Sequence, residues 1–361
     1  MNDDPAGAGN PDASLPPSLA RYSRQILYPG IGLEGQQRLR NASATLIGCG
    51  ALGSALANTL VRAGIGALRI IDRDFIEPVN LQRQTLFDEQ DIAQNLPKAE
   101  AAARKLRRIN SAVEVEGIVA DIHPANIAAL CGSADLLLDG TDNLETRYLI
   151  NDFAVRTETP WVYGACLGAE GLVLAIVPHR TPCLRCIWDD PPAPGSLPTC
   201  DTAGILMSAA SIVAAFQAIE ALKILAGRTD ALHGRLLAID AWTGQCRALN
   251  VQAAHAADCI CCQQRRYEYL EGDRFASATA LCGRDAVQIR PVTSSAEGPA
   301  VSFRAIAERL PARAAARYNE YMLRFRADDF AVTLFADGRA IIQGTGDPAA
   351  ARAIYAQYIG V

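Results

Sequence analysis

The feature that most constrains this chain is a glycine-rich turn between an expected strand and an expected helix. The run ATLIGCG at 44–50 predicts a strand, and SALANTLVRAG at 54–64 predicts a helix that ends at a glycine. Between them, Gly48, Gly50 and Gly53 form a GxGxxG pattern. Glycines allow a tight turn and a close approach of the backbone to phosphate, which a helix N-terminus also favours. The pattern therefore predicts a nucleotide site, with a purely structural turn as the alternative.

The rest of the chain repeats this alternation of strand and helix. Further strands are expected at 67–74, 113–122 and 134–142, and further helices at 96–110, 145–157 and 203–226. Such alternation predicts an α/β fold with a doubly wound, Rossmann-like, mostly parallel sheet.

The pattern changes after Cys262, where a second and smaller unit is expected. Residues 275–361 read as a small α+β domain whose last helix opens with Asp347 as N-cap and Pro348 at the first helical position. Two domains suit 361 residues at about 150 residues per domain. We therefore expect a disordered tail at 1–19, a nucleotide-binding domain at 20–270 and the small domain at 275–361.

Composition and charge exclude several classes of protein. The net charge is −5, which argues against binding nucleic acid through bulk charge. Residues 1–19 contain no Lys or Arg and no apolar run, so we expect a tail and not a signal peptide. The segment Thr202–Ile219 has no charge in 18 residues, but its serines, glutamine and many alanines favour a buried helix over a membrane span. We accordingly expect a cytoplasmic protein that binds neither membrane nor nucleic acid.

Charged residues around the glycine turn indicate which nucleotide is bound. Asp72 lies 19 residues beyond Gly53 at the end of the next strand, where an acid would hold ribose hydroxyls. A dinucleotide such as NAD would be the default for this pattern. The residues that follow suit a triphosphate better, because cations can offset phosphate charge and a carboxylate can hold Mg²⁺. They are Arg24, Asn80, Arg83, Lys98, Asp142 and Asn143, although either arginine alone could be an ordinary surface residue.

The cysteines predict a metal site. Eleven cysteines cannot all pair, and in a reducing compartment cysteines more often bind metal or react than form disulfides. Two CxxC pairs, Cys183 with Cys186 and Cys259 with Cys262, suit a tetrahedral Zn²⁺ bound by four thiolates. Such a site is closed, so the zinc would be structural. A redox dithiol or unpaired buried thiols are the alternatives, and Cys261 is the spare residue.

Cys200 is a candidate nucleophile. It follows a proline-rich stretch and precedes the long apolar helix, and a helix N-terminus lowers the pKa of a thiol. The alternative is a loop cysteine without a special role.

Taken together, these motifs resemble those of the MoeB/ThiF/HesA adenylyltransferases, bacterial relatives of ubiquitin-activating enzymes. The resemblance covers about residues 20–270 and rests on RYSRQ, GCGALGS, Asp72 with Asp74, NLQRQ, PKA, DGTDN followed by Arg147, and the paired CxxC. It implies that Mg-ATP converts the C-terminal Gly-Gly carboxylate of a ubiquitin-like sulfur carrier to an acyl-adenylate, with release of pyrophosphate. The activated carrier would then become a thiocarboxylate for molybdopterin, thiamine or related synthesis.

The resemblance also implies roles for single residues. Gly48, Gly50 and Gly53 would form the nucleotide turn, Asp72 would bind ribose, and Asp142 would bind Mg²⁺. Asn80, Arg83 and Lys98 would neutralise the phosphates. Arg24 would reach the ATP of the partner across a homodimer interface, Cys183, Cys186, Cys259 and Cys262 would bind zinc, and Cys200 would bond covalently to the carrier or its sulfur.

Three other functions stay open at this point. The same adenylation could act on a peptide C-terminus or a small carboxylic acid, the chain could be an NAD-dependent oxidoreductase, or it could be a non-catalytic interaction module. The sequence contains no recognisable sulfurtransferase domain, so the sulfur donor is expected to be a separate protein such as a sulfurtransferase or a cysteine desulfurase.

Overall fold

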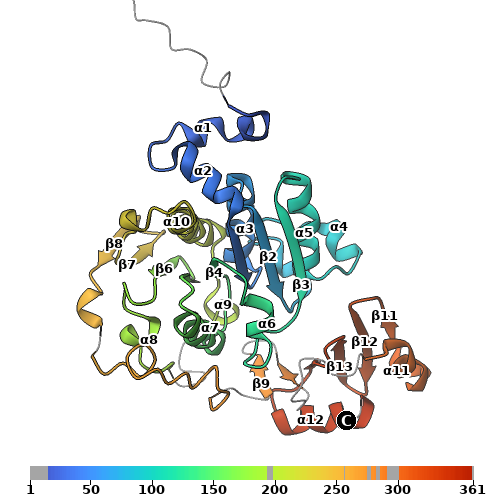
Figure 1. Ribbon diagram of the computed structural model, residues 1–361. Helices are drawn as coiled ribbons and strands as arrows, with labels where there is room; N and C mark the ends of the chain where they lie inside the picture. Colours follow the sequence, from blue (N-terminus) through green and yellow to red (C-terminus); the bar gives the residue numbers. More distant parts are fainter. Residues whose placement is uncertain are drawn as a thin grey trace, which may run out of the picture.

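The computed structural model describes residues 15–192, 198–255, 257–274, 278–281, 285–290 and 301–359 (Figure 1). Of the predicted disordered tail, residues 1–14 lie outside the described residues. The prediction is wrong for residues 17–19, which begin a 3-10 helix, η2 (Pro17–Tyr22), with Leu19 buried. A proline in the first turn favours this conformation because its φ angle already suits a helix.

The first sheet has eight strands in the order β3-β2-β1-β4-β5-β6-β7-β8. Its strands are β1 (Ser43–Ile47), β2 (Ala67–Asp72), β3 (Glu114–Val119), β4 (Leu136–Asp139), β5 (Trp161–Leu167), β6 (Glu170–Ile176), β7 (Leu236–Asp240) and β8 (Gln245–Leu249). Strands β1 to β5 pair in parallel, and β6 to β8 extend the sheet in antiparallel fashion. The predicted doubly wound, mostly parallel sheet is confirmed.

Helices cover both faces of this sheet. They are α1 (Ser23–Ile26), α2 (Gly32–Asn41), α3 (Ala51–Ala63), α4 (Glu89–Ala93), α5 (Lys98–Ile109), α6 (Ile127–Cys131), α7 (Leu144–Thr157), α8 (Leu184–Ile187), α9 (Cys200–Ala203) and α10 (Met207–Leu225), with short 3-10 helices η3 (Pro78–Asn80), η4 (Thr229–Ala231) and η5 (Gln252–Ala254). Helices α3, α5 and α10 bury one face, and α6 and α7 bury the other.

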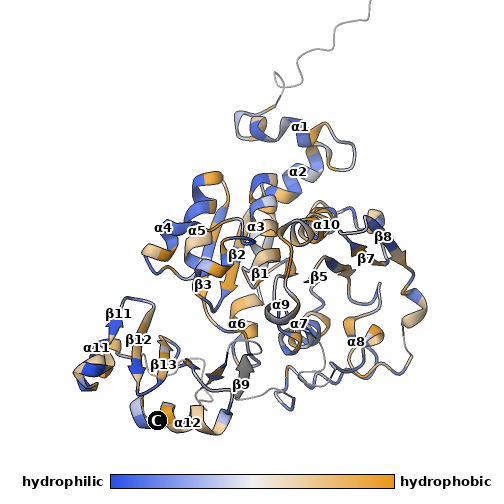
Figure 2. Ribbon diagram, turned by 180° about the vertical axis from the view of Figure 1, so that it is seen from behind, coloured by the Kyte–Doolittle hydropathy of each residue, from blue (hydrophilic) through white to orange (hydrophobic). Residues whose placement is uncertain are grey.

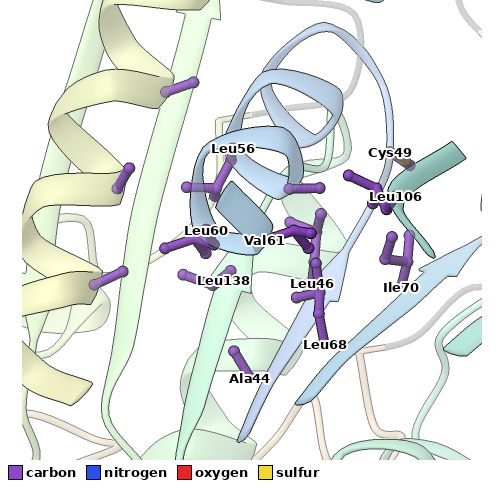
Figure 3. Close-up of a cluster of buried hydrophobic side chains, with 14 of the residues drawn as sticks. Ala44, Leu46, Cys49, Leu56, Leu60, Val61, Leu68, Ile70, Leu106 and Leu138 are labelled. Atoms are coloured by element: carbon purple, nitrogen blue, oxygen red, sulfur yellow. The ribbon is translucent and has the colours of Figure 1, made fainter. Parts of the chain in front are cut away.

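The two cores follow from strand geometry, since successive side chains of a strand point to opposite faces. Leu46 belongs to the core under α3, whereas its neighbour Ile47 belongs to the core under α7. Figure 3 shows side chains from strands, such as Leu46 and Leu138, gathered with Leu56 and Leu60 of α3.

The predicted helix at 203–226 corresponds to α10 but starts four residues later than predicted, and only Ala203 of the predicted range belongs to the preceding short helix α9. Gly204 has a φ of +76°, and Ile205 forms a bridge with Gly168, so the backbone leaves the helix between them. Among the described helices, α10 alone is long and apolar enough to cross a membrane, and it is mostly orange in Figure 2. It is nevertheless a core helix, because it packs on α3 and the sheet and Gln217 donates a hydrogen bond to the Asp139 carbonyl at 2.8 Å.

The C-terminal part forms a second sheet of six antiparallel strands in the order β11-β12-β13-β14-β10-β9. Its elements are β9 (Ala278–Leu281), β10 (Ala286–Ile289), α11 (Phe303–Arg309), η6 (Ala312–Ala314), β11 (Arg317–Tyr318), β12 (Met322–Ala327), β13 (Phe330–Phe335), β14 (Ala340–Gln343) and α12 (Pro348–Tyr358). The sheet has a separate core, and Asp347 caps α12 as predicted. The domain boundaries at 270 and 275 stay a prediction.

Candidate active site and metal centre

The glycine turn connects β1 to α3, and two of its glycines are required by close backbone contacts. Gly48 has a φ of +89°, and a Cβ at Gly53 would lie 2.0 Å from the Gly48 carbonyl oxygen. Gly50 differs, because the nearest atom to its ideal Cβ is Gln84 Nε2 at 3.9 Å. The backbone at Gly50 is therefore not crowded by close neighbours, and the N-terminus of α3 at this point favours a group that accepts hydrogen bonds.

Asp72 ties the glycine turn to the end of β2. Its carboxylate accepts hydrogen bonds from the backbone N–H of Cys49 at 2.6 Å and of Asp74 at 2.7 Å. Burial and the nearby Asp74 raise the pKa of Asp72, while Lys98 acts in the opposite direction. Asp72 thus holds the turn in place, and its ribose role stays a prediction.

Lys98 opens α5 and is buried beside three carboxylates. Its ammonium group lies 3.1 Å from a carboxylate oxygen of Asp74. Burial alone would lower the pKa of Lys98, but the neighbouring carboxylates outweigh burial and raise it. They belong to Asp74, Asp72 and Asp142. Lys98 is therefore a cation held in place at the glycine turn, as a phosphate-binding residue must be.

The segment after β2 contains polar atoms that lack partners. The Asn80 Oδ1 atom accepts from the Glu77 N–H at 3.0 Å, but its Nδ2 is buried without a hydrogen bond among the described residues. The same holds for Gln84 Oε1. A buried polar atom without a partner costs about 1–3 kcal/mol, so both atoms are suited to a polar ligand. Arg83 is half-buried and uses one N–H on the Val79 carbonyl at 2.7 Å.

The loop after β4 is held by a buried ion pair. Asp139 is fully buried, and Arg147 Nε lies 3.0 Å from its carboxylate, whereas Arg147 Nη2 donates to the Thr141 carbonyl at 2.7 Å. This support leaves the Asp142 side chain exposed. Asn143 caps α7, where its Oδ1 accepts a hydrogen bond from the Thr146 N–H at 3.4 Å, and its predicted contact with the nucleotide stays a prediction.

The two CxxC pairs lie next to each other in the structure, as predicted from their spacing. Their four Sγ atoms lie within 4.8 Å of one another, with 3.8 Å from Cys183 to Cys186, 3.7 Å from Cys183 to Cys259 and 3.4 Å from Cys186 to Cys262. Thiolates about 2.3 Å from a tetrahedral metal would lie about 3.8 Å apart, whereas a disulfide spans about 2.0 Å. The donor set therefore fits one metal ion. Cys261 is buried outside this set and accepts from Asn151 Nδ2 at 3.3 Å.

A model described as the ThiF family matches residues 22–261, two thirds of the chain. The chain belongs to the ThiF family.

Relatives of this ThiF-family protein extend the match. It is 43% identical over 341 residues to the "Sulfur carrier protein ThiS adenylyltransferase" of Bacillus subtilis (strain 168), covering 94% of this chain and 99% of that protein. It is 37% identical over 253 residues to the "Adenylyltransferase and sulfurtransferase MOCS3-2" of Zea mays, covering 70% of this chain and only 52% of that protein. The Bacillus match therefore includes the C-terminal sheet, which lies beyond the family model.

Solved structures agree on the fold. The crystal structure of E. coli MccB with ATP superposes with a TM-score of 0.59 at 24% identity, covering 67% of this chain and 74% of that one. At this identity the similarity concerns the fold alone.

Arg24 does not join the other predicted site residues within one protomer. It is exposed on α1, and its neighbour Gln25 donates to the Ala63 carbonyl at the end of α3. The glycine turn lies at the opposite end of this 13-residue helix, about 20 Å away at 1.5 Å per residue.

Cys200 begins the four-residue α9 and not the long α10, because Gly204 separates the two helices. Its side chain lies outside the described residues, so its predicted role stays a prediction.

Sequence reasoning assigned no role to three residues of this site. Asp74 pairs with Lys98, Gln84 lies beside the uncrowded backbone at Gly50, and Asp139 anchors Arg147. Asp74 and Gln84 both belong to motifs that carry the family resemblance, but the sequence does not show which groups these side chains contact.

Proposed function

We propose that this protein uses ATP to adenylylate the C-terminal Gly-Gly carboxylate of a ubiquitin-like sulfur carrier, releasing pyrophosphate and preparing thiocarboxylate formation. The observation that carries the proposal is the buried Lys98, surrounded by three carboxylates beside the glycine turn. The 43% identity to a ThiS adenylyltransferase over nearly the whole chain supports the choice of substrate.

The reaction needs charge neutralisation more than acid–base chemistry. A carboxylate oxygen of the carrier attacks the α-phosphorus, the bond to the bridging oxygen breaks, and pyrophosphate leaves with its electrons. Because both reactants are anions, Lys98 and Arg83 lower the barrier by offsetting their repulsion. Arg83 has five N–H donors, of which Val79 occupies one.

Both metals have suitable donors. Asp142 offers an exposed carboxylate for Mg²⁺, which when bound would supply further positive charge to the phosphates. The four cysteines suit Zn²⁺, which would join the segment at 183–186 to the segment at 259–262 as a structural clamp.

A homodimer would complete the site. Exposed apolar side chains occur on the α1–α2 segment at Leu27, Tyr28 and Leu33, and on α10 at Ile212 and Ile219. The two segments are neighbours, since Arg228 beyond α10 donates to the Pro29 carbonyl at 3.4 Å. A second copy on this face would bury these side chains and carry Arg24 toward the partner's ATP.

The remaining partners follow from the chemistry. The sulfur donor would be a separate sulfurtransferase or cysteine desulfurase, and the Cys200 thiolate would bond covalently to the carrier by attacking the acyl-adenylate carbonyl, with AMP as the leaving group. The reduced state that a four-thiolate metal site requires suits the cytoplasm.

ATP–pyrophosphate exchange tests the adenylation. We expect exchange that depends on a carrier ending in Gly-Gly and is lost when the carrier lacks its last glycine. Asp142→Ala should abolish exchange, whereas Glu114→Ala, an exposed acid at the start of β3, should not change it. Exchange with a short peptide or a small carboxylic acid alone would replace the substrate proposed here. Binding of NAD without ATP would overturn the proposal altogether.

Mixing two inactive variants tests the dimer. If Arg24 acts across the interface, Arg24→Ala mixed with Asp142→Ala restores about one quarter of the parent activity, because about half of all dimers contain one copy of each variant and each of these has one intact site out of two. No recovery would contradict the action of Arg24 across the interface, and a monomer in sedimentation would contradict the dimer.

A further inference from the structure

We propose that the C-terminal domain is part of the nucleotide site, because Arg339 and Arg290 are positioning residues for the segment from Asp72 to Asp74. The inference rests on the proposed function and gives the second sheet a role within it.

The contacts form an interdomain cluster of five residues: Arg73, Asp121, Gln288, Arg290 and Arg339. The buried Asp121 accepts from Arg73 at 3.0 Å, from Arg290 at 2.6 Å and from the Gln288 amide at 2.8 Å. Gln288 and Arg290 belong to β10 or follow it directly, so the second sheet supplies two of these three donors. Asp121 thus joins the two domains through charge-assisted hydrogen bonds.

Arg339 reaches further into the first domain. It lies between β13 and β14, is only 1% exposed, and has its guanidinium 3.7 Å from the centre of the Phe335 ring. One nitrogen donates to the backbone carbonyl of Arg73 at 2.9 Å, and another lies 3.4 Å from Gln288 Oε1. A side chain of the second domain therefore binds the backbone between Asp72 and Asp74.

The hydrogen bond from Arg339 to the Arg73 carbonyl holds a rigid peptide unit. The Arg73 carbonyl and the Asp74 N–H belong to one peptide unit, which is planar. Arg339 binds its oxygen, and Asp72 binds its N–H at 2.7 Å. The same Asp72 carboxylate holds the N–H of Cys49 in the glycine turn.

Asp74, which supplies the N–H of this peptide, also contacts Lys98. Asp74 pairs with the Lys98 ammonium through its carboxylate, and its backbone carbonyl accepts from the Lys98 N–H at 2.9 Å. The peptide bound by Arg339 therefore connects directly to the glycine turn and to the buried cation, the two parts that would bind phosphate.

An apolar contact next to the interdomain cluster also joins the two domains. Phe75 follows Asp74, and its ring centre lies 5.7 Å from that of Phe335, with Met322 buried in the same group. This contact can hold the domains together without Arg339, so a change at Arg339 can be tested in a protein that keeps its interface.

The experiment uses the full chain and measures ATP binding directly, by calorimetry without carrier, beside ATP–pyrophosphate exchange. Arg339→Met should weaken ATP binding at least tenfold and raise the KM for ATP, with the KM for the carrier unchanged. Arg339→Lys should recover part of the binding, because lysine restores the charge without the planar fork. The control is Arg309→Lys, an exposed arginine at the end of α11.

Thermal melting separates positioning from loss of structure. If Arg339→Met does not fold, Arg290→Lys serves as the milder change, with the same expected direction. An ATP affinity within twofold of the parent in a folded variant would overturn the inference and leave the proposed function intact. If the parent itself binds no ATP, the proposed function fails together with the inference.

Discussion

The nucleotide site and the cysteine cluster are both built from distant parts of the chain, but by opposite means. The cluster brings together four identical donors whose Sγ atoms lie within 4.8 Å, with no position left for another ligand. The predicted nucleotide site combines charges of both signs, an uncrowded backbone at Gly50 and, among the described residues, two buried polar atoms without hydrogen-bond partners. A bound metal would complete the first arrangement and stabilise the fold, whereas the second would be satisfied only by a bound nucleotide.

The largest effect is expected at the cysteine cluster. Cys259→Ser should abolish metal binding and lower the free energy of unfolding by about 4 kcal/mol or more, the range typical of losing a structural metal. Metal content and thermal melting measure this. Cys261→Ser is the matched control, since Cys261 lies outside the set, and equal metal loss in both variants would contradict the assignment.

A variant at Lys98 should behave in the opposite way to a cysteine variant, because it should lose activity and keep its metal. Lys98→Gln should lower the exchange rate about 10²–10³-fold, the usual effect of removing one group that stabilises a developing charge. Arg108→Gln, exposed on the same helix, should have no effect. If the Lys98 variant also lost its metal, the two centres would not be independent.

Gln84 tests whether the unpartnered atoms belong to the substrate site. Gln84→Leu should weaken ATP binding about tenfold, the value of one hydrogen bond at its upper range, without lowering the melting temperature. Gln82→Leu is the exposed neighbour for comparison. A lower melting temperature with unchanged ATP binding would instead assign Gln84 to the fold.

The smallest effect concerns acid pH. Burial alone would raise the pKa of Asp121, but the guanidinium groups of Arg73 and Arg290 outweigh it and hold that pKa below its ordinary range. The stability that Asp121 contributes is therefore present above about pH 3.9, its unfolded value, and is lost as the pH falls further. The melting temperatures of the parent and of Asp121→Asn should differ at pH 5, and the difference should shrink progressively as the pH falls below about 3.9. A constant difference would exclude this linkage.

Local patterns in the chain predicted much of this molecule. The turn at Gly48 and Gly53, the pairing of Cys183 and Cys186 with a second CxxC, and the cap at Asp347 each depend on a few neighbouring residues. For that reason they could be inferred without coordinates. The start of the long apolar helix was predicted four residues too early, because a bridge between Gly168 and Ile205, which are distant in the sequence, holds the backbone before Met207 out of the helix.

The sequence by itself determined the fold class, the position of the glycine turn and the four cysteines that cluster, because spacing along the chain is enough to specify them. Only the tertiary structure decided that Asn143 caps a helix, that Gln84 lies beside Gly50 and that Arg24 lies at the far end of α3. It also decided that Arg339 binds the peptide next to Asp72, 267 positions away in the sequence. The direction of a hydrogen bond and the burial of a charge depend on which segments pack together, and spacing alone does not contain that information.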